Sequence, residues 1–181
     1  MNIYFTADTH LNHPALANIR AFKFGLGFKS TKEHDEFIIT NWNSVVRKGD
    51  EVYLLGDFCF GSHEIVRSMR TRLNGKIHLI MGSHDRANKI HNLPELFASI
   101  SDLKTIKIDA QKIVLCHYAM RVWAYSHYGS WHLYGHSHRN LEGWGKSFDV
   151  GVDCWNYYPI SIDKVVEEME KRPDNFNLIR K

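Results

Sequence analysis

Five short segments bearing Asp or His recur along this chain, each where an apolar run gives way to polar residues. The segments are Asp8-Thr9-His10, Gly56-Asp57, Gly82-Ser83-His84-Asp85, Cys116-His117 and Gly135-His136-Ser137-His138. Short apolar runs bounded in this way are typical of buried strands. Loops at the carboxyl ends of strands in an open α/β sheet converge on one crevice. The pattern therefore favours an α/β fold in which all five segments meet.

The spacing of apolar residues predicts the strands and helices around these segments. Predicted strands cover 2–7, 51–55, 76–81, 103–108, 112–116, 131–134 and 147–152, and predicted helices cover 31–47, 63–73 and a final stretch that opens at Ser161 or Asp163 and ends before Pro173. The first half alternates strand and helix, whereas the second half is richer in strands and contains a candidate hairpin. Since no internal repeat or linker divides the chain, we expect residues 1–181 to form one α/β domain.

The overall composition indicates which binding partners and which cellular compartment to expect. A formal net charge of +3 does not indicate strong nucleic-acid binding. Three cysteines without a CxxC motif argue against a disulfide framework and favour a reducing cytoplasm. No apolar run approaches the roughly 18 residues of a membrane span, and the first residues lack the basic stretch of a signal peptide. We therefore expect a cytoplasmic protein without a membrane partner.

The side chains of the five segments are suited to metal binding. Imidazoles and carboxylates together favour Zn, Mn or Fe over Ca or Mg alone. In an extended segment, alternate residues such as Asp8 and His10, or His136 and His138, can point to the same side. Any one segment is more often an ordinary turn or a buried histidine, but five at strand ends are hard to explain by chance. Together they predict a metal site.

The five segments resemble the motifs of the calcineurin-like metallophosphoesterase superfamily. That family carries DxH, GD, GNH followed by Asp or Glu, a lone His and GHxH, in the order seen here. The stretches 41–46 and 147–153 further resemble a small single-domain bacterial and phage branch of it. The likeness covers residues 1 to about 153. It implies a four-layer α/β/β/α sandwich of two mixed β-sheets flanked by helices.

The resemblance also implies two divalent metal ions and their ligands. The first would be held by Asp8, His10, Asp57 and His138, and the second by Asp57, His117 and His136, with Asp57 bridging both. Mn²⁺ is the expected metal, with Zn²⁺, Fe²⁺ or Fe³⁺, and Ni²⁺ as alternatives. Two such cations about 3.5–4 Å apart share a water, lower its pKa and clamp a phosphoryl group.

One position departs from the family pattern. Ser83 stands where the family has an Asn that binds the second metal, and a serine hydroxyl is shorter and a weaker neutral ligand. Either the second metal binds weakly or a water fills the gap. The residue is either natural variation or a substitution made to trap a ligand. We expect Ser83 to occupy a ligand position of reduced strength.

The next two residues are expected to be catalytic. In the family, the residue at His84 stabilises the transition state or protonates the leaving oxygen. We expect Asp85 to orient His84 and to raise its pKa toward neutrality, as general-acid catalysis requires.

Candidate substrate-binding residues lie between and beside the motifs. The stretch 118–131 is rich in Arg, His and aromatic residues, so Arg121 or His127 could contact a phosphate oxygen and Trp123 could stack on a base. The alternative is that these aromatics pack the loop and Arg121 is solvated. His13 follows the first motif closely and is a further candidate for the wall of the site.

The leading functional prediction is hydrolysis of a phosphodiester by attack of a metal-bound hydroxide. The short chain has no obvious capping domain, so the site should be open to small or extended substrates such as nucleotides. One alternative is a phosphomonoesterase, including a protein phosphatase. Another is a scaffold that binds a phosphorylated ligand without turnover, which Ser83 keeps open. A nuclease within a larger assembly is a third, although the modest net charge disfavours it. The oligomeric state stays open.

Overall fold

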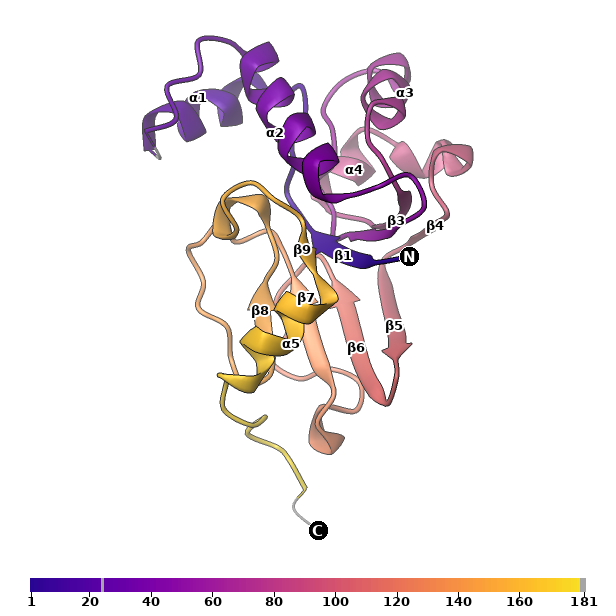
Figure 1. Cartoon of the computed structure of the whole chain (residues 1–181), viewed down its shortest axis with the longest axis vertical. Helices are drawn as coiled ribbons and strands as arrows, with labels where there is room; N and C mark the ends of the chain where they lie inside the picture. The colour runs from indigo at the N-terminus through magenta and orange to yellow at the C-terminus, as the bar shows by residue number, and fades with distance from the viewer. Residues whose placement is uncertain (24, 180–181) are drawn as a thin grey trace.

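The computed structural model describes residues 1–23 and 25–179, whose strands form two mixed sheets (Figure 1). The first sheet has the order β4 (Ser99–Ser101), β3 (Lys76–Ile80), β2 (Glu51–Leu54), β1 (Ile3–Thr6) and β9 (Ile160–Ser161). The second has the order β5 (Leu103–Ile108), β6 (Gln111–Cys116), β7 (Trp131–Tyr134) and β8 (Ser147–Asp149). β9 is antiparallel to β1 and β5 to β6, whereas the remaining neighbours are parallel.

Helices pack around these sheets. They are α1 (Pro14–Lys23), α2 (Thr31–Val45), α3 (His63–Thr71), α4 (Ser83–Ala87) and α5 (Ile162–Glu170). In Figure 1, α2 and α3 lie above the first sheet, and the second sheet and α5 lie below it. Ser30, Ser62 and Ser161 each accept a backbone N–H from three residues further on, and so cap α2, α3 and α5.

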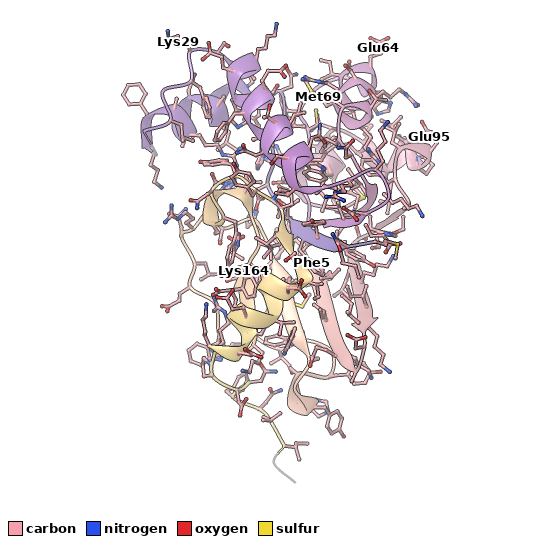
Figure 2. All side chains as sticks on the ribbon, in the orientation of Figure 1. Phe5, Lys29, Glu64, Met69, Glu95 and Lys164 are labelled. Atoms are coloured by element: carbon pink, nitrogen blue, oxygen red, sulfur yellow. The ribbon has the colours of Figure 1, made fainter. Side chains whose placement is uncertain are left out.

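The core has two parts because alternate residues of the first sheet face opposite ways. In β2, Val52 and Leu54 join a buried cluster with residues of α2 and α3. Their neighbours Tyr53 and Leu55 join a second cluster with residues of β6, β7 and α5. Phe5, labelled in Figure 2, belongs to this second cluster at the junction of the sheets. The first sheet is therefore buried on both faces.

The predicted fold class, two mixed sheets with flanking helices, is confirmed. Every predicted strand overlaps an observed one, although β6 begins one residue earlier than predicted and the stretch 147–152 leaves the sheet after Asp149. The sequence did not predict α1, α4, β4 or β9. In the part of the chain that is described, no helix is long and apolar enough to cross a membrane.

The two sheets meet near the carboxyl ends of their strands. An isolated parallel bridge pairs Ala7, just after β1, with Gly151, just after β8. It is closed by a hydrogen bond from the Val152 N–H to the Ala7 carbonyl at 3.0 Å. This contact brings the loops of both sheets to the same edge, where the five motifs lie.

Candidate metal centre

The loops that carry the five motifs are joined by backbone hydrogen bonds. The N–H of Asp8 donates to the Gly56 carbonyl at 2.9 Å. The N–H of His136 donates to Asp8 Oδ2 at 2.8 Å, and the N–H of His84 donates to Asp57 Oδ1 at 2.9 Å. Segments more than 100 residues apart in sequence are thus fixed against one another.

Among the described residues, three groups of side chains are able to hold a metal, and two of them come from these loops alone. Ligand atoms of Asp8, His10 and His138 all lie within 4.8 Å of one another, and so do those of Asp57, His117 and His136. Asp57 connects the groups, because its Oδ2 lies 3.6 Å from His10 Nε2 and 3.4 Å from His117 Nε2. The structure therefore brings together all six Asp and His residues that the sequence predicted as ligands, with Asp57 between the groups.

These residues fit the divalent metals that the predicted site requires. Asp8 Oδ1, His10 Nε2 and His117 Nε2 are buried and have no hydrogen-bond partner in the structure. Such groups are costly to bury without a partner. Each of the three atoms faces a candidate group, so a bound cation would satisfy them together.

Backbone strain also concentrates at this site. Five of the predicted ligands have positive φ angles, which non-glycine residues seldom adopt. They are Asp8 (58°), His10 (46°), Asp57 (55°), His136 (69°) and His138 (45°). Strain of this kind persists where the surrounding structure imposes it, and it clusters at functional sites.

Burial perturbs the first group strongly. It raises the pKa of Asp8 to about 7, against the opposing effect of His138 and His117. It lowers the pKa of His10 to about 2. Both shifts favour the neutral forms, as expected for ionisable groups removed from water.

The pKa values of Asp57 and His117 shift in the opposite direction, toward the charged forms. Burial alone would raise the pKa of Asp57, but the nearby imidazole of His117 and, less strongly, that of His10 outweigh it and lower the pKa to about 2. Burial alone would lower the pKa of His117, but the carboxylates of Asp57 and Asp8 raise it to about 9. Both shifts favour the charged forms, so the carboxylates at the centre attract positive charge, which fits a site for cations.

A buried network behind His138 was not predicted from the sequence. His138 Nδ1 lies 2.6 Å from Asp153 Oδ2, so its Nε2 is the nitrogen turned to the first group. Asp153 in turn binds the guanidinium of Arg20 through two hydrogen bonds, of 2.9 and 2.8 Å. A carboxylate that orients a metal-binding imidazole is a common feature of metal sites. Asp153 and Arg20 are therefore positioning residues of the centre.

The structure corrects the role predicted for Asp85. Its two carboxylate oxygens accept the backbone N–H groups of Asp57, Phe58 and Gly82, at 2.8 to 2.9 Å. Asp85 therefore fixes the loops that carry Asp57 and His84, and does not orient the His84 ring. Neighbouring positions on a helix point in different directions, and both residues belong to α4.

Three of the predicted substrate-binding residues have other partners. Trp123 is buried, donates from Nε1 to the Ser130 carbonyl and packs on His132. The guanidinium of Arg121 lies over the rings of Trp144 and Phe176, at 4.4 and 5.1 Å. His127 lies in a 3-10 turn just before β7, at the end of the sheet opposite to the motifs. All three side chains therefore have partners on the protein itself, and their contact with a substrate stays a prediction.

His13, in contrast, does lie at the centre. Its ring centroid is 5.5 Å from that of His10 and 5.4 Å from that of His84. Phe60 packs against His13 at 5.0 Å and is 41% exposed, so it forms part of the rim. Nothing in the sequence marks Phe60 beyond its place after the second motif.

Ser83 is exposed at the first position of α4, directly after Gly82. Gly82 packs so closely on Asp57 that an added Cβ would lie 2.2 Å from Asp57 Oδ1. Its φ of −96° is open to any residue, so the restriction is one of space alone.

Gly82→Ala is therefore expected to displace Asp57 and to weaken metal affinity about 10–100-fold, as loss of a group that holds a ligand in place typically does. Calorimetric titration with Mn²⁺ would measure it. Gly49→Ala is the matched control, since nothing lies within 4 Å of its added Cβ. Equal affinities for the two variants would contradict the prediction.

Two mixed sheets with Asp and His side chains gathered at their strand ends define the metallophosphoesterase fold. Residues 1–150 match the calcineurin-like phosphoesterase superfamily domain, and the chain belongs to this family. The family consists of phosphoester hydrolases and generally binds divalent metals, which agrees with the candidate Asp and His groups.

Similar proteins occur in archaea, bacteria and phages. The chain is 32% identical over 178 residues to the uncharacterised protein MJ1445 of Methanocaldococcus jannaschii, covering 93% of this chain and 92% of that protein. It is 24% identical over 196 residues to the gene 66 protein of Mycobacterium phage D29, covering 92% and 94%. The crystal structure of AQ665 from Aquifex aeolicus, a protein of unknown function, matches with a TM-score of 0.71 and 27% identity, covering 92% of this chain and 98% of that one.

Proposed function

We propose that this protein hydrolyses a phosphodiester with two divalent cations, and that these are Mn²⁺. The cations would be held by Asp8, His10, Asp57 and His138 on one side, and by Asp57, His117 and His136 on the other, with Ser83 beside the second. The observation that carries this proposal is the set of three buried, unpartnered ligand atoms in two groups connected by Asp57.

The bound cations and the residues of the protein would contribute different parts of the catalysis. When bound, two divalent cations supply Lewis-acid activation of water and neutralise charge on the phosphoryl group. The carboxylate of Asp57 holds the two groups in register, and the hydrogen bond from the His84 N–H fixes one of its oxygens. Imidazoles outnumber carboxylates in the two groups, so the loaded centre keeps net positive charge to attract a phosphate anion.

His84 and His13 are the proposed residues in contact with the substrate. The His84 ring stands 5.0 Å from that of His10, at the edge of the first group, where it can protonate a leaving oxygen. His13 Nδ1 accepts the N–H of Leu16 at 3.3 Å, so in the neutral ring Nε2 carries the proton and can donate to a phosphoryl oxygen.

Metal analysis coupled to a substrate pair tests the proposal. Protein equilibrated with Mn²⁺ should contain two cations per chain and hydrolyse bis(p-nitrophenyl) phosphate faster than p-nitrophenyl phosphate. A preference for the monoester would support the phosphomonoesterase alternative. Two bound cations without turnover of either substrate would support a scaffold that binds a phosphorylated ligand.

Ser83→Asn is expected to strengthen the second metal position, because a carboxamide oxygen reaches further than the serine hydroxyl. We expect metal affinity at that position to rise about tenfold, within the range that one supporting group contributes, and turnover to rise with it. Manganese titration and the diester assay measure the two effects. Unchanged affinity and rate would show that Ser83 does not occupy a ligand position, and no gain in turnover would favour the scaffold.

A further inference from the structure

α1 places apolar side chains directly beside the candidate metal centre. Leu16, Ile19 and Lys23 line a groove together with His138, Asn140 and Asp153. The groove has a volume of about 180 Å³. Ile19 is 50% exposed, so part of its side chain is open to a molecule in the groove.

The helix is held firmly enough to act as a wall. Its adjoining side is anchored by buried Ala17 and Arg20. Arg20 reaches the backbone carbonyls of Asp8 and Thr9 as well as Asp153. Residues three or four apart lie on one side of a helix, so Leu16 and Ile19 form a continuous apolar strip next to the anchored face.

The groove adjoins the metal centre at His138. This residue lines the groove and also belongs to the group with Asp8 and His10. A molecule whose phosphoryl group lies at the centre would therefore place a neighbouring substituent against Leu16 and Ile19. Apolar cavities of about 150 Å³ accept a benzene ring, so the groove has the size for one aromatic ring.

His84 does not line this groove and has different neighbours. His84 groups with His10 and His13, and Phe60 lies 6.3 Å from its ring. If His84 protonates the leaving oxygen, the leaving arm lies beside Phe60 and His13. The groove beside His138 then faces the arm that stays on phosphorus, and only a phosphodiester has such an arm.

We propose that the groove between α1 and His138 binds an aromatic ring, of the size of a pyrimidine base, on the retained arm of a phosphodiester. This inference rests on the proposed function and specifies its substrate class. It assigns Leu16 and Ile19 as residues that determine specificity.

Two stable anions separate ring binding from phosphoryl binding. Phenylphosphonate and methylphosphonate differ only in the ring, and calorimetry on the manganese-loaded protein measures their Kd values without turnover. We expect phenylphosphonate to bind about tenfold more tightly, in line with the contribution of an apolar group in a pocket. Ile19→Gln should abolish that advantage and leave methylphosphonate binding unchanged.

Phe22→Gln is the matched control, because Phe22 is 94% exposed on the same helix and lines a different cavity. It should keep the tenfold advantage. A kinetic pair gives a second readout: thymidine 5′-(p-nitrophenyl phosphate) and methyl p-nitrophenyl phosphate share a leaving group. Ile19→Gln should remove the preference for the thymidine ester through KM.

Equal Kd values for the two phosphonates on the unaltered protein would overturn the groove proposal and leave the proposed function standing. Loss of the advantage in Phe60→Ala but not in Ile19→Gln would also overturn it, by placing the ring on the leaving side. If neither anion binds the manganese-loaded protein, the proposed function itself fails, and the groove proposal fails with it.

Discussion

Asp57→Asn is expected to lower diester hydrolysis about a thousandfold, equivalent to ~4 kcal/mol of activation free energy, and to reduce bound Mn²⁺ from two cations per chain to fewer than one. The substitution keeps the shape of the side chain and removes its charge. Asp57 Oδ2 lies within 3.6 Å of both His10 Nε2 and His117 Nε2, so one change weakens both groups.

Metal content and stability are measured alongside the rate. Asp109→Asn is the control, since Asp109 is exposed in the turn between β5 and β6 and has a left-handed backbone that Asn tolerates. This substitution also removes one negative charge, but it does so at the start of β6, whereas His117 follows the end of that strand. Two cations per chain and normal turnover in Asp57→Asn would refute the assignment of Asp57 as the residue shared by both metals.

The sequence predicts that these Asp and His residues lie together, and they do, because their positions follow a rule of topology. The predicted ligands lie in loops that follow strands, and the carboxyl ends of the strands converge whatever the details of packing. A reader of the sequence can therefore assemble Asp8, Asp57 and His117 from position alone. The network behind them is harder to predict, because nothing local associates Arg20 with Asp153, 133 residues away.

The differences between the sequence predictions and the structure have physical causes of a different kind. The apolar spacing does not predict α1, because Ile19 and Phe22 are exposed and its apolar residues do not outline one buried face. Pro14 at its first position is a usable signal for the start of a helix. The place of Trp123 between two motifs favours a role in substrate binding, yet its ring packs on buried His132 of β7. Position in sequence locates a loop, but only packing decides which of its side chains face the site.

Arg20→Met is expected to be the most destabilising single change behind the centre. The Arg20 side chain is fully buried and donates to both carboxylate oxygens of Asp153 and to the carbonyls of Asp8 and Thr9. Met preserves much of the volume but leaves a buried carboxylate without its cation. Breaking a buried ion pair in this way costs about 3–5 kcal/mol, which for a chain of this size lowers Tm by roughly 10 °C.

Thermal unfolding of the metal-free protein measures this effect without any contribution from bound cations. Arg67→Met is the matched control, because Arg67 is 47% exposed and pairs with Glu95 on the surface, where an ion pair contributes at most about 1 kcal/mol. The double variant Arg20→Met with Asp153→Asn should regain part of the lost stability, because the unpaired charge is gone.

The same variants separate stability from function. Because Asp153 orients His138 and Arg20 anchors α1, Asp153→Asn alone should weaken Mn²⁺ binding about 10–100-fold, and the double variant should not recover that affinity although it recovers stability. A double variant that regains both would reduce Arg20 and Asp153 to a structural pair. Arg20→Met with the Tm of the unaltered protein would show that the buried network does not hold the DxH loop and α1 together.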